Sequence, residues 1–155
     1  MLLLDIVGLF LAGVLAGEEF IVRYGVQPAL TALADHPHLL ARQSLVRRLR
    51  VVVPAIMVPT VLAAIAVLVV AGGGPGFAFR IAGMAALVVF VLASFLGTVP
   101  INIRVNDWNP EAPPADWKQV VTRWQRIDVL RSSAALLAFA LFLVAFALAF
   151  VGGAR

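Results

Sequence analysis

The sequence predicts an all-α integral membrane protein: a four-helix bundle of up-down-up-down topology, with an additional cytoplasmic helical extension before the fourth span. Three observations predict this fold. First, 63 % of the 155 residues are apolar, whereas a soluble domain carries about 45–50 %. Second, only 13 % of the residues are charged. Third, the apolar residues gather in stretches of the roughly 20 residues that cross a bilayer. A soluble domain this small could not bury so many apolar side chains, so the composition excludes a soluble enzyme, a disordered chain and a nucleic-acid-binding module.

Four stretches are expected to span the membrane within a single domain that covers residues 1–155. The spans are expected at about 2–33, 51–71, 78–100 and 127–151, and the first is interrupted by charged residues. A turn rich in Gly and Pro (72–76) separates the second and third spans. The polar segments 34–50 and 101–126 form two long connections. Asp116 can cap a helix that continues from the second connection into the fourth span.

The distribution of basic residues predicts the orientation. The two long connections and the span ends beside them hold most of the Lys and Arg, whereas the opposite side holds Arg80 and Arg155. By the positive-inside rule, both connections lie in the cytoplasm. We therefore expect a multi-pass protein of the cell membrane with both termini outside. Its net charge of +4 reflects this orientation, so its expected partner is the lipid bilayer and not a nucleic acid.

Charged residues within the predicted spans are candidates for function, because each costs roughly 2.5–3.5 kcal/mol to insert. Glu19 and Arg23 are four residues apart on one helix face, which predicts an ion pair between them. Glu18 is left without a partner on its own helix, so we expect it either to point into the bundle or to be neutral. In the fourth span, Asp128 and Arg131 share a helix face; from the residues alone they could equally be a simple ion pair at the interface.

A set of polar side chains is expected to meet in the cytoplasmic half of the bundle, because the spans alternate in direction and bring these positions to a similar depth. Bundles build their sites from side chains on facing helices in such places. The candidate catalytic residues are Glu18, Asn102, Asp128 and Arg131. The candidate substrate-binding residues are Glu19, Arg23, Tyr24 and Trp124.

We expect no metal site and no cofactor. The chain has no Cys, and its two histidines, His36 and His38, lie in the first polar connection. A His-Pro-His sequence is a weak metal-binding pattern, and histidines in such a segment are more often solvated. The Glu-x-x-His motif of di-iron bundles is absent from the sequence, and the predicted spans contain no His that could ligate haem.

Three sequence features together resemble a known family. They are AGEEFIVRYGVQPAL in the first span, TVPIN at the end of the third, and W-x3-D-x2-R at the start of the fourth. This order resembles the DUF1772 family of membrane proteins, which includes anthrone oxygenases of polyketide pathways. The resemblance covers nearly the whole chain and is most specific at Pro100, Asn102, Trp124 and Arg131. Family members often carry His where this chain has Asp128, so either Asp128 takes that role or the chemistry differs.

The resemblance implies a cofactor-independent oxygenase that oxidises an activated aromatic, such as an anthrone, with O₂. An apolar pocket would take this lipophilic small molecule from the bilayer. Glu18, or else Asp128, would remove the acidic proton. Arg131 and Asn102 would stabilise the oxyanion that develops, and Trp124 and Tyr24 would stack on the ring.

Two other functions remain open from the residues alone. A small proton-coupled exporter could use Glu18, since small multidrug-resistance transporters also have four spans with a lone Glu in the first. A non-enzymatic accessory or structural membrane protein could dock through Gly13 and Gly17, because this small-xxx-small face lets another helix approach closely. The same face could join two copies of the chain in a homo-oligomer.

Overall fold

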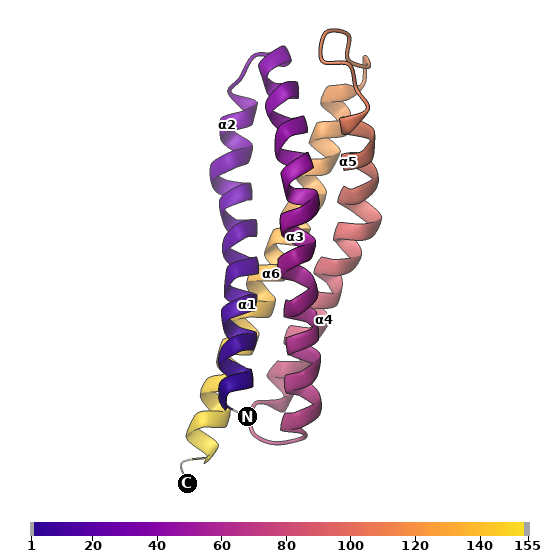
Figure 1. Ribbon diagram of the computed structural model, residues 1–155. Helices are drawn as coiled ribbons and strands as arrows, with labels where there is room; N and C mark the ends of the chain where they lie inside the picture. Colours follow the sequence, from indigo (N-terminus) through magenta and orange to yellow (C-terminus); the bar gives the residue numbers. More distant parts are fainter. Residues whose placement is uncertain (1, 154–155) are drawn as a thin grey trace.

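The structure, a computed structural model, describes residues 2–153 and contains helices, turns and no strand within them. The first helical rod comprises α1 (Leu2–Ile21), the π-helical segment η1 (Val22–Val26) and α2 (Gln27–Thr31) without a break. The second is α3 (Asp35–Ala71). The third joins α4 (Phe77–Leu92), the π-helical segment η2 (Ala93–Thr98) and α5 (Val99–Asn106), and the last is α6 (Trp117–Gly153). The prediction of an all-α fold is confirmed for this part of the chain (Figure 1).

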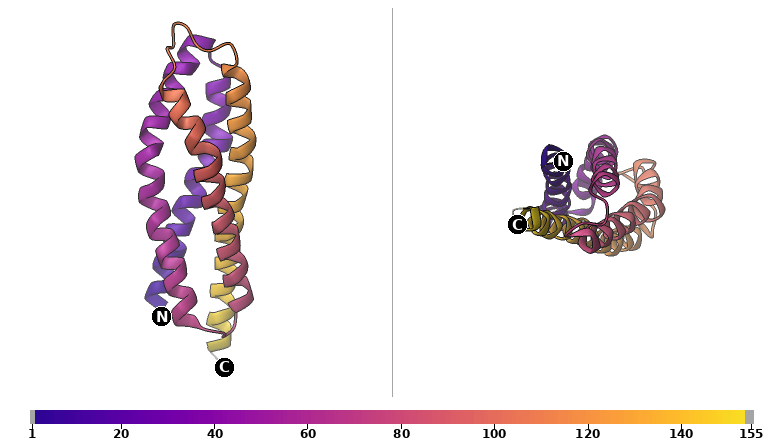
Figure 2. Two further views of the ribbon diagram at one scale, coloured as in Figure 1. Left: turned by 90° about the vertical axis from the view of Figure 1, so that its right-hand side faces the viewer. Right: turned by 90° about the horizontal axis from the view of Figure 1, so that it is seen from below.

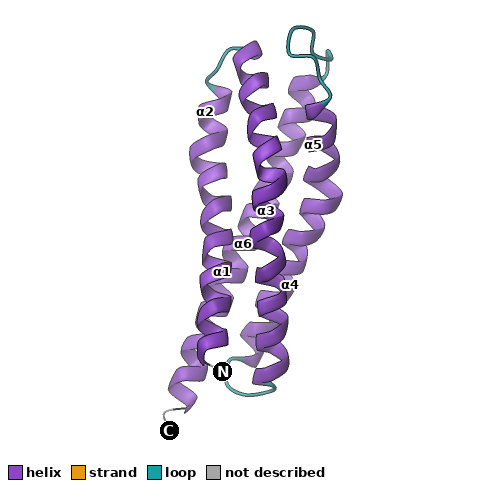
Figure 3. Ribbon diagram, viewed as in Figure 1, coloured by secondary structure: helices purple, strands orange, loops and turns teal. Residues whose placement is uncertain are grey.

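The rods lie side by side and successive rods run in opposite directions (Figures 1 and 2). The start of α1, the end of α6 and the α3–α4 turn lie at one end of the molecule, which we call the termini end. The α2–α3 connection and the loop over 107–116 lie at the other, the loop end (Figure 3). Helix α6 packs most extensively against α4 and α1, whereas α3 packs on α1 and only loosely on α4 and α5. The loose contact leaves room for a cavity between α3 and the η2–α5 segment.

Three helices are long and apolar enough to cross a membrane: Asp35–Ala71, Phe77–Asn106 and Trp117–Gly152. Large apolar side chains project outward along them, including Leu62, Val69 and Leu96. These features indicate a membrane protein. The first predicted span differs because α1 contains Asp5, Glu18 and Glu19, and its crossing stays a prediction. The polar segment 34–50 is a helical extension of the second predicted span, because α3 begins at Asp35.

A polar layer separates two clusters of buried apolar side chains. The cluster towards the termini end includes Leu15, Met57 and Phe90, and the one towards the loop end includes Leu39 and all three tryptophans. On α1, on the third rod and on α6, the residues between the clusters are buried and polar: Glu19, Ser94, Thr98, Asp128, Arg131 and Ser132. Buried polar groups are costly without partners, and several bonds join this layer: Arg131 donates to Glu19, and the hydroxyls of Ser94 and Thr98 donate to backbone carbonyls.

Both π-helical segments precede a proline. The Gln27 N–H, directly before Pro28, donates to the carbonyl of Val22, five residues back. The Val99 N–H, directly before Pro100, donates in the same way to the carbonyl of Ser94. A proline has no N–H, and its ring clashes with the carbonyl four residues back. A wider turn relieves that clash without ending the helix, and π-helical turns are frequent at functional sites. Both segments lie beside the polar layer.

Gly76 is required by the turn between α3 and α4. Its φ is +83°, and a Cβ there would clash with the carbonyl oxygen of Ala145 on α6. We expect Gly76→Ala to lower the free energy of unfolding by about 1–3 kcal/mol, because it combines backbone strain with this clash. Gly73→Ala is the matched control, since no atom lies within 4 Å of its Cβ position. Unfolding in detergent checks the prediction; equal stability of the two variants would contradict it.

Candidate functional site

Arg131 is the centre of the polar layer. Its Nη2 donates to Glu19 Oε1 over 2.6 Å and lies 3.5 Å from Asp128 Oδ1. Its Nη1 donates to Thr98 Oγ1 over 3.5 Å, and its guanidinium lies over the ring of Phe90. The side chains of Arg131, Glu19 and Asp128 are at most 5 % exposed. One buried cation therefore holds carboxylates from α1 and α6 together and reaches the third rod.

The expected ion pair between Glu19 and Arg23 is wrong. Arg23 Nη1 donates instead to Ser133 Oγ over 2.9 Å and to Ser132 Oγ over 3.2 Å on α6. The spacing of four residues brings side chains together on an α-helix, but Arg23 lies within the wider π-helical segment η1. The change of register turns Arg23 towards α6 and leaves Glu19 to Arg131.

Asn102 and Trp124 join α5 to α6. Trp124 Nε1 donates to Asn102 Oδ1 over 2.9 Å, so the Asn102 carbonyl has its partner and the amide nitrogen is free to act as a donor elsewhere. The indole is 3 % exposed, and the Arg42 guanidinium lies 5.3 Å above its ring. These two candidates are therefore fixed in orientation by each other.

Glu18 and Tyr24 stand apart from this arrangement. Glu18 is partly buried, and both of its carboxylate oxygens lack a hydrogen-bond partner among the described residues. Tyr24 is 55 % exposed, and its ring contacts Phe20 and the Arg23 guanidinium. Neither residue lines a cavity that contains Arg131.

A cavity of about 340 Å³ lies between α3 and the η2–α5 segment, within the roughly 300–1,000 Å³ typical of small-molecule sites. We call it the Arg131 cavity. Three sequence-predicted residues line it: Asn102, Trp124 and Arg131. Its apolar walls include Val46, Val53, Met57, Phe95 and Val99, and its further polar lining includes Arg42, Arg50, Ser94, Thr98 and Asp107. This mixture suits an apolar ligand that carries a few oxygen atoms.

Asp128 opens onto a different cavity of about 360 Å³, between the first rod and α6. It is lined by Arg23, Gln27, Thr31 and Gln125, among others. Asp128 therefore touches Arg131 but does not line the Arg131 cavity.

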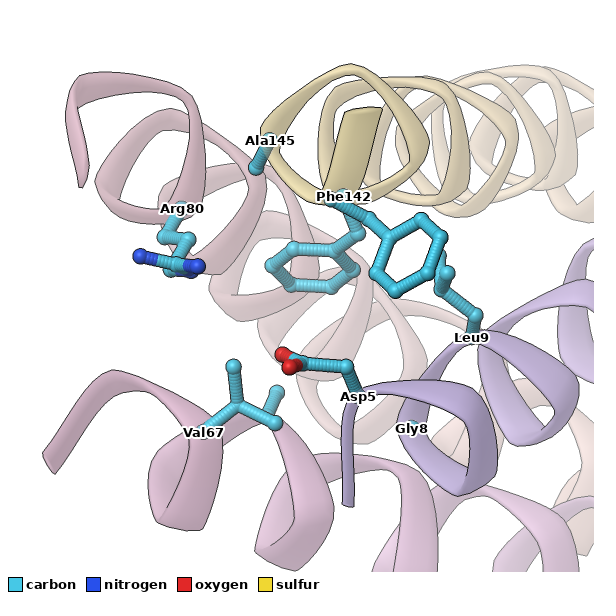
Figure 4. A pocket seen from close by; sticks show the side chains of 9 residues that line it. Asp5, Gly8, Leu9, Val67, Arg80, Phe142 and Ala145 are labelled. Atoms are coloured by element: carbon cyan, nitrogen blue, oxygen red, sulfur yellow. The ribbon is translucent and has the colours of Figure 1, made fainter. Parts of the chain in front are cut away.

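A much smaller cavity of about 30 Å³ lies near the termini end, where Asp5, Arg80 and Phe142 face one another from three helices (Figure 4). Its volume suits only about two water molecules.

Arg42 is a cavity residue that sequence reasoning missed. It is 1 % exposed; its Nε donates to His38 Nε2 over 3.1 Å and its Nη2 to Gln27 Oε1 over 3.0 Å. In the sequence it belongs to a run of basic residues that indicated only orientation. The signal that could have found it is the spacing of four residues from His38, which places both side chains on one helix face.

The two histidines do not share a site. His36 pairs with Glu111 over 2.8 Å, whereas His38 accepts from Arg42. Within residues 2–153, no group of three or more His, Asp or Glu is arranged to hold a metal ion. The expected absence of a metal or cofactor stays a prediction.

The predicted docking face of α1 is partly used within the chain. A Cβ at Gly13 would lie 3.2 Å from the ring of Phe139 on α6, whereas nothing lies within 4 Å of a Cβ at Gly17. Gly13 thus permits close packing of α1 on α6. Its use between two copies of the chain stays a prediction.

In the comparison with protein families, a family model described as anthrone oxygenase matches residues 43–141. The matched segment contains Asn102, Asp107, Trp124, Asp128 and Arg131, and begins directly after Arg42. It leaves out the first rod with Glu18, Glu19, Arg23 and Tyr24. The searches of curated proteins and of solved structures found no match. The match covers more than half of the chain and most of the Arg131 cavity.

Proposed function

The chain belongs to the anthrone oxygenase family, and from this premise we propose that it is a membrane-embedded oxygenase of a lipophilic aromatic such as an anthrone. In the proposed reaction, both C–H bonds at the carbon opposite the carbonyl break. O₂ delivers one oxygen atom to that carbon and leaves with the two hydrogens as water, so the anthrone becomes a quinone. The single observation that supports this proposal is the Arg131 cavity, which is apolar, of suitable volume, and lined by Asn102, Trp124 and Arg131.

The proposal includes a four-helix transmembrane bundle. Three helices qualify as spans by length and composition, and α1 packs along both α3 and α6. We propose that α1 crosses the bilayer with them, since its Glu19 charge is matched by Arg131 inside the bundle. Both long polar connections then lie in the cytoplasm, as the distribution of basic residues predicts.

We assign the stabilisation of the substrate oxyanion to Arg131 and Asn102. Loss of a proton from an anthrone spreads negative charge onto its carbonyl oxygen, and donors aimed at a developing oxyanion are worth several kcal/mol in a water-poor site. Arg131 supplies a cation, and Asn102 supplies an amide donor whose orientation the Trp124 hydrogen bond fixes. The electron-rich anion can then reduce O₂.

The geometry changes our assignment of the base. Neither Glu18 nor Asp128 lines the Arg131 cavity, whereas Asp107 does. Asp107 is exposed and lies at the end of α5, where a proton could pass on to water. We therefore propose Asp107 as the direct proton acceptor. Glu19 and Asp128 become positioning residues that act through Arg131, by holding its guanidinium at the cavity wall.

The test is turnover by the purified protein in lipid nanodiscs. Anthrone is supplied under air, and quinone formation and O₂ uptake are followed together. We expect one O₂ consumed per quinone formed, at a rate well above that of protein-free nanodiscs, which report the slow spontaneous reaction. A rate equal to the protein-free control would contradict the proposal.

One observation favours a second function, proton-coupled export. Glu18 carries a carboxylate without a hydrogen-bond partner among the described residues, within an apolar helix. Substrate-dependent proton flux in proteoliposomes that is lost in Glu18→Gln would support the exporter. Turnover that survives Glu18→Gln would favour the oxygenase.

A further inference from the structure

Arg42 is a buried cation without a carboxylate partner. Its hydrogen bonds go to a histidine nitrogen and an amide oxygen, and its guanidinium lies over an indole ring. The acceptor in the first bond is His38 Nε2, so that imidazole is neutral with its proton on Nδ1. Among residues 2–153, no Asp or Glu lies within ion-pair distance of Arg42. All the contacts of this charge are therefore neutral.

Arg131 provides the comparison within the same cavity. Both guanidiniums line it and both are almost fully buried. Arg131 has Glu19 and Asp128 beside it, so its charge is balanced within the protein. Arg42 has no carboxylate in contact. Asp128 acts on it only from beyond ion-pair distance and is itself next to Arg131. A buried cation without a directly bonded counter-ion is costly, and one that faces a ligand cavity is best explained by an anion that arrives with the ligand.

We propose that the Arg131 cavity takes an aromatic ligand with an acidic group, a carboxylate or a phenolate, and that Arg42 binds this group. The inference rests on the proposed function only in using the same cavity. The apolar walls accept the ring system, and the planar guanidinium pairs with the anion through strong, charge-assisted hydrogen bonds. Arg50 at the cavity adds a second positive charge against the single carboxylate of Asp107, which also favours an anion.

The proposal is tested by equilibrium binding, without turnover. The probes are anthraquinone-2-carboxylate and its primary amide, which have nearly the same shape and differ in charge. Quenching of tryptophan fluorescence reports binding, since Trp124 lines the cavity. We expect the carboxylate to bind about tenfold more tightly than the amide, which corresponds to one strong hydrogen bond to a charged group. Partition into detergent favours the neutral amide, so it cannot produce this preference.

Variants of Arg42 decide whether this residue carries the preference. Arg42→Gln should erase it, and Arg42→Lys should keep part of it because the positive charge remains. Arg47→Gln is the matched control: it removes the same charge from an exposed position of α3 outside the cavity, and it should keep the full preference. Thermal unfolding confirms that each variant is folded.

Two results would overturn the inference. One is equal binding of the two probes to the unchanged protein, and the other is a carboxylate preference that survives in Arg42→Gln. Anthrone turnover without any preference for anions would support the proposed function and reject this inference. Selective anion binding without turnover would do the reverse.

Discussion

Val99→Trp should lower kcat/KM for anthrone by about 100-fold while the protein keeps its fold. Val99 is the first residue of α5, lines the Arg131 cavity and is 37 % exposed. An indole at this rim position can swing into the cavity without overpacking a sealed core. It would occupy the space of the substrate ring, and a displacement of the reacting atoms by about 1 Å already costs about 100-fold in rate.

The measurement is steady-state quinone formation in nanodiscs, with thermal unfolding recorded on the same samples. Leu96→Trp is the matched control, because Leu96 lies one turn earlier, is 76 % exposed and does not line the cavity. It should keep the activity of the unchanged protein. If both variants lose activity equally, or if neither does, the reaction does not take place in the Arg131 cavity.

Arg131→Met should lower the free energy of unfolding by about 3–5 kcal/mol, the range observed when one partner of a buried ion pair is removed. The substitution keeps an unbranched apolar stem and removes the cation. Glu19 and Asp128, whose side chains are 0 % and 2 % exposed, then remain buried without a positive partner. The Thr98 hydroxyl also loses its contact with Nη1.

A double variant separates the charge from the packing. Glu19→Gln combined with Arg131→Met removes the carboxylate that Arg131 contacts most closely, so it should be more stable than Arg131→Met alone. Arg126→Met, an exposed position on the same helix, should change stability by less than about 0.5 kcal/mol. Reversible unfolding in mixed detergent micelles measures these variants together with Glu19→Gln alone, which completes the double-mutant cycle. Additive losses in the double variant would show that Glu19 and Arg131 are not coupled.

The sequence was sufficient to predict the helices and the depth within the bundle at which the polar side chains gather. Apolar stretches of membrane length are unambiguous, and a charge within such a stretch is rare enough to attract notice. Asp128 and Arg131 were found in this way, and the alternation of the helices placed Asn102 and Trp124 at the same depth. Polar and charged residues are therefore easiest to recognise as candidates where the surrounding sequence is apolar.

The partners within the layer could not be predicted. Glu19 has Arg23 in favourable local spacing, yet it pairs with Arg131 of a distant helix, because the wider turn of η1 moves Arg23 away. Arg42 was hidden for a different reason: it lies among loop-end arginines, where a positive charge is normally a matter of orientation. The Arg131 cavity depends on how loosely α3 packs against the third rod, which no periodicity encodes.

The two wide turns before Pro28 and Pro100 have a consequence for how such chains can be compared. A turn closed by a bond to the fifth residue back holds one more residue than an α-helical turn. Each of these helical rods therefore contains one residue more than a regular α-helix that spans the same distance.

This extra residue matters for relatives of the chain. A relative that replaced either proline and returned to regular helix would need a single-residue deletion nearby, or every later side chain on that helix would rotate by about 100°. In the first rod this would turn Gln27 away from Arg42, and in the third it would turn Asn102 away from Trp124. A relative that has lost one of these prolines, has a regular helix there and shows no one-residue gap beside it is therefore not expected to share this polar layer.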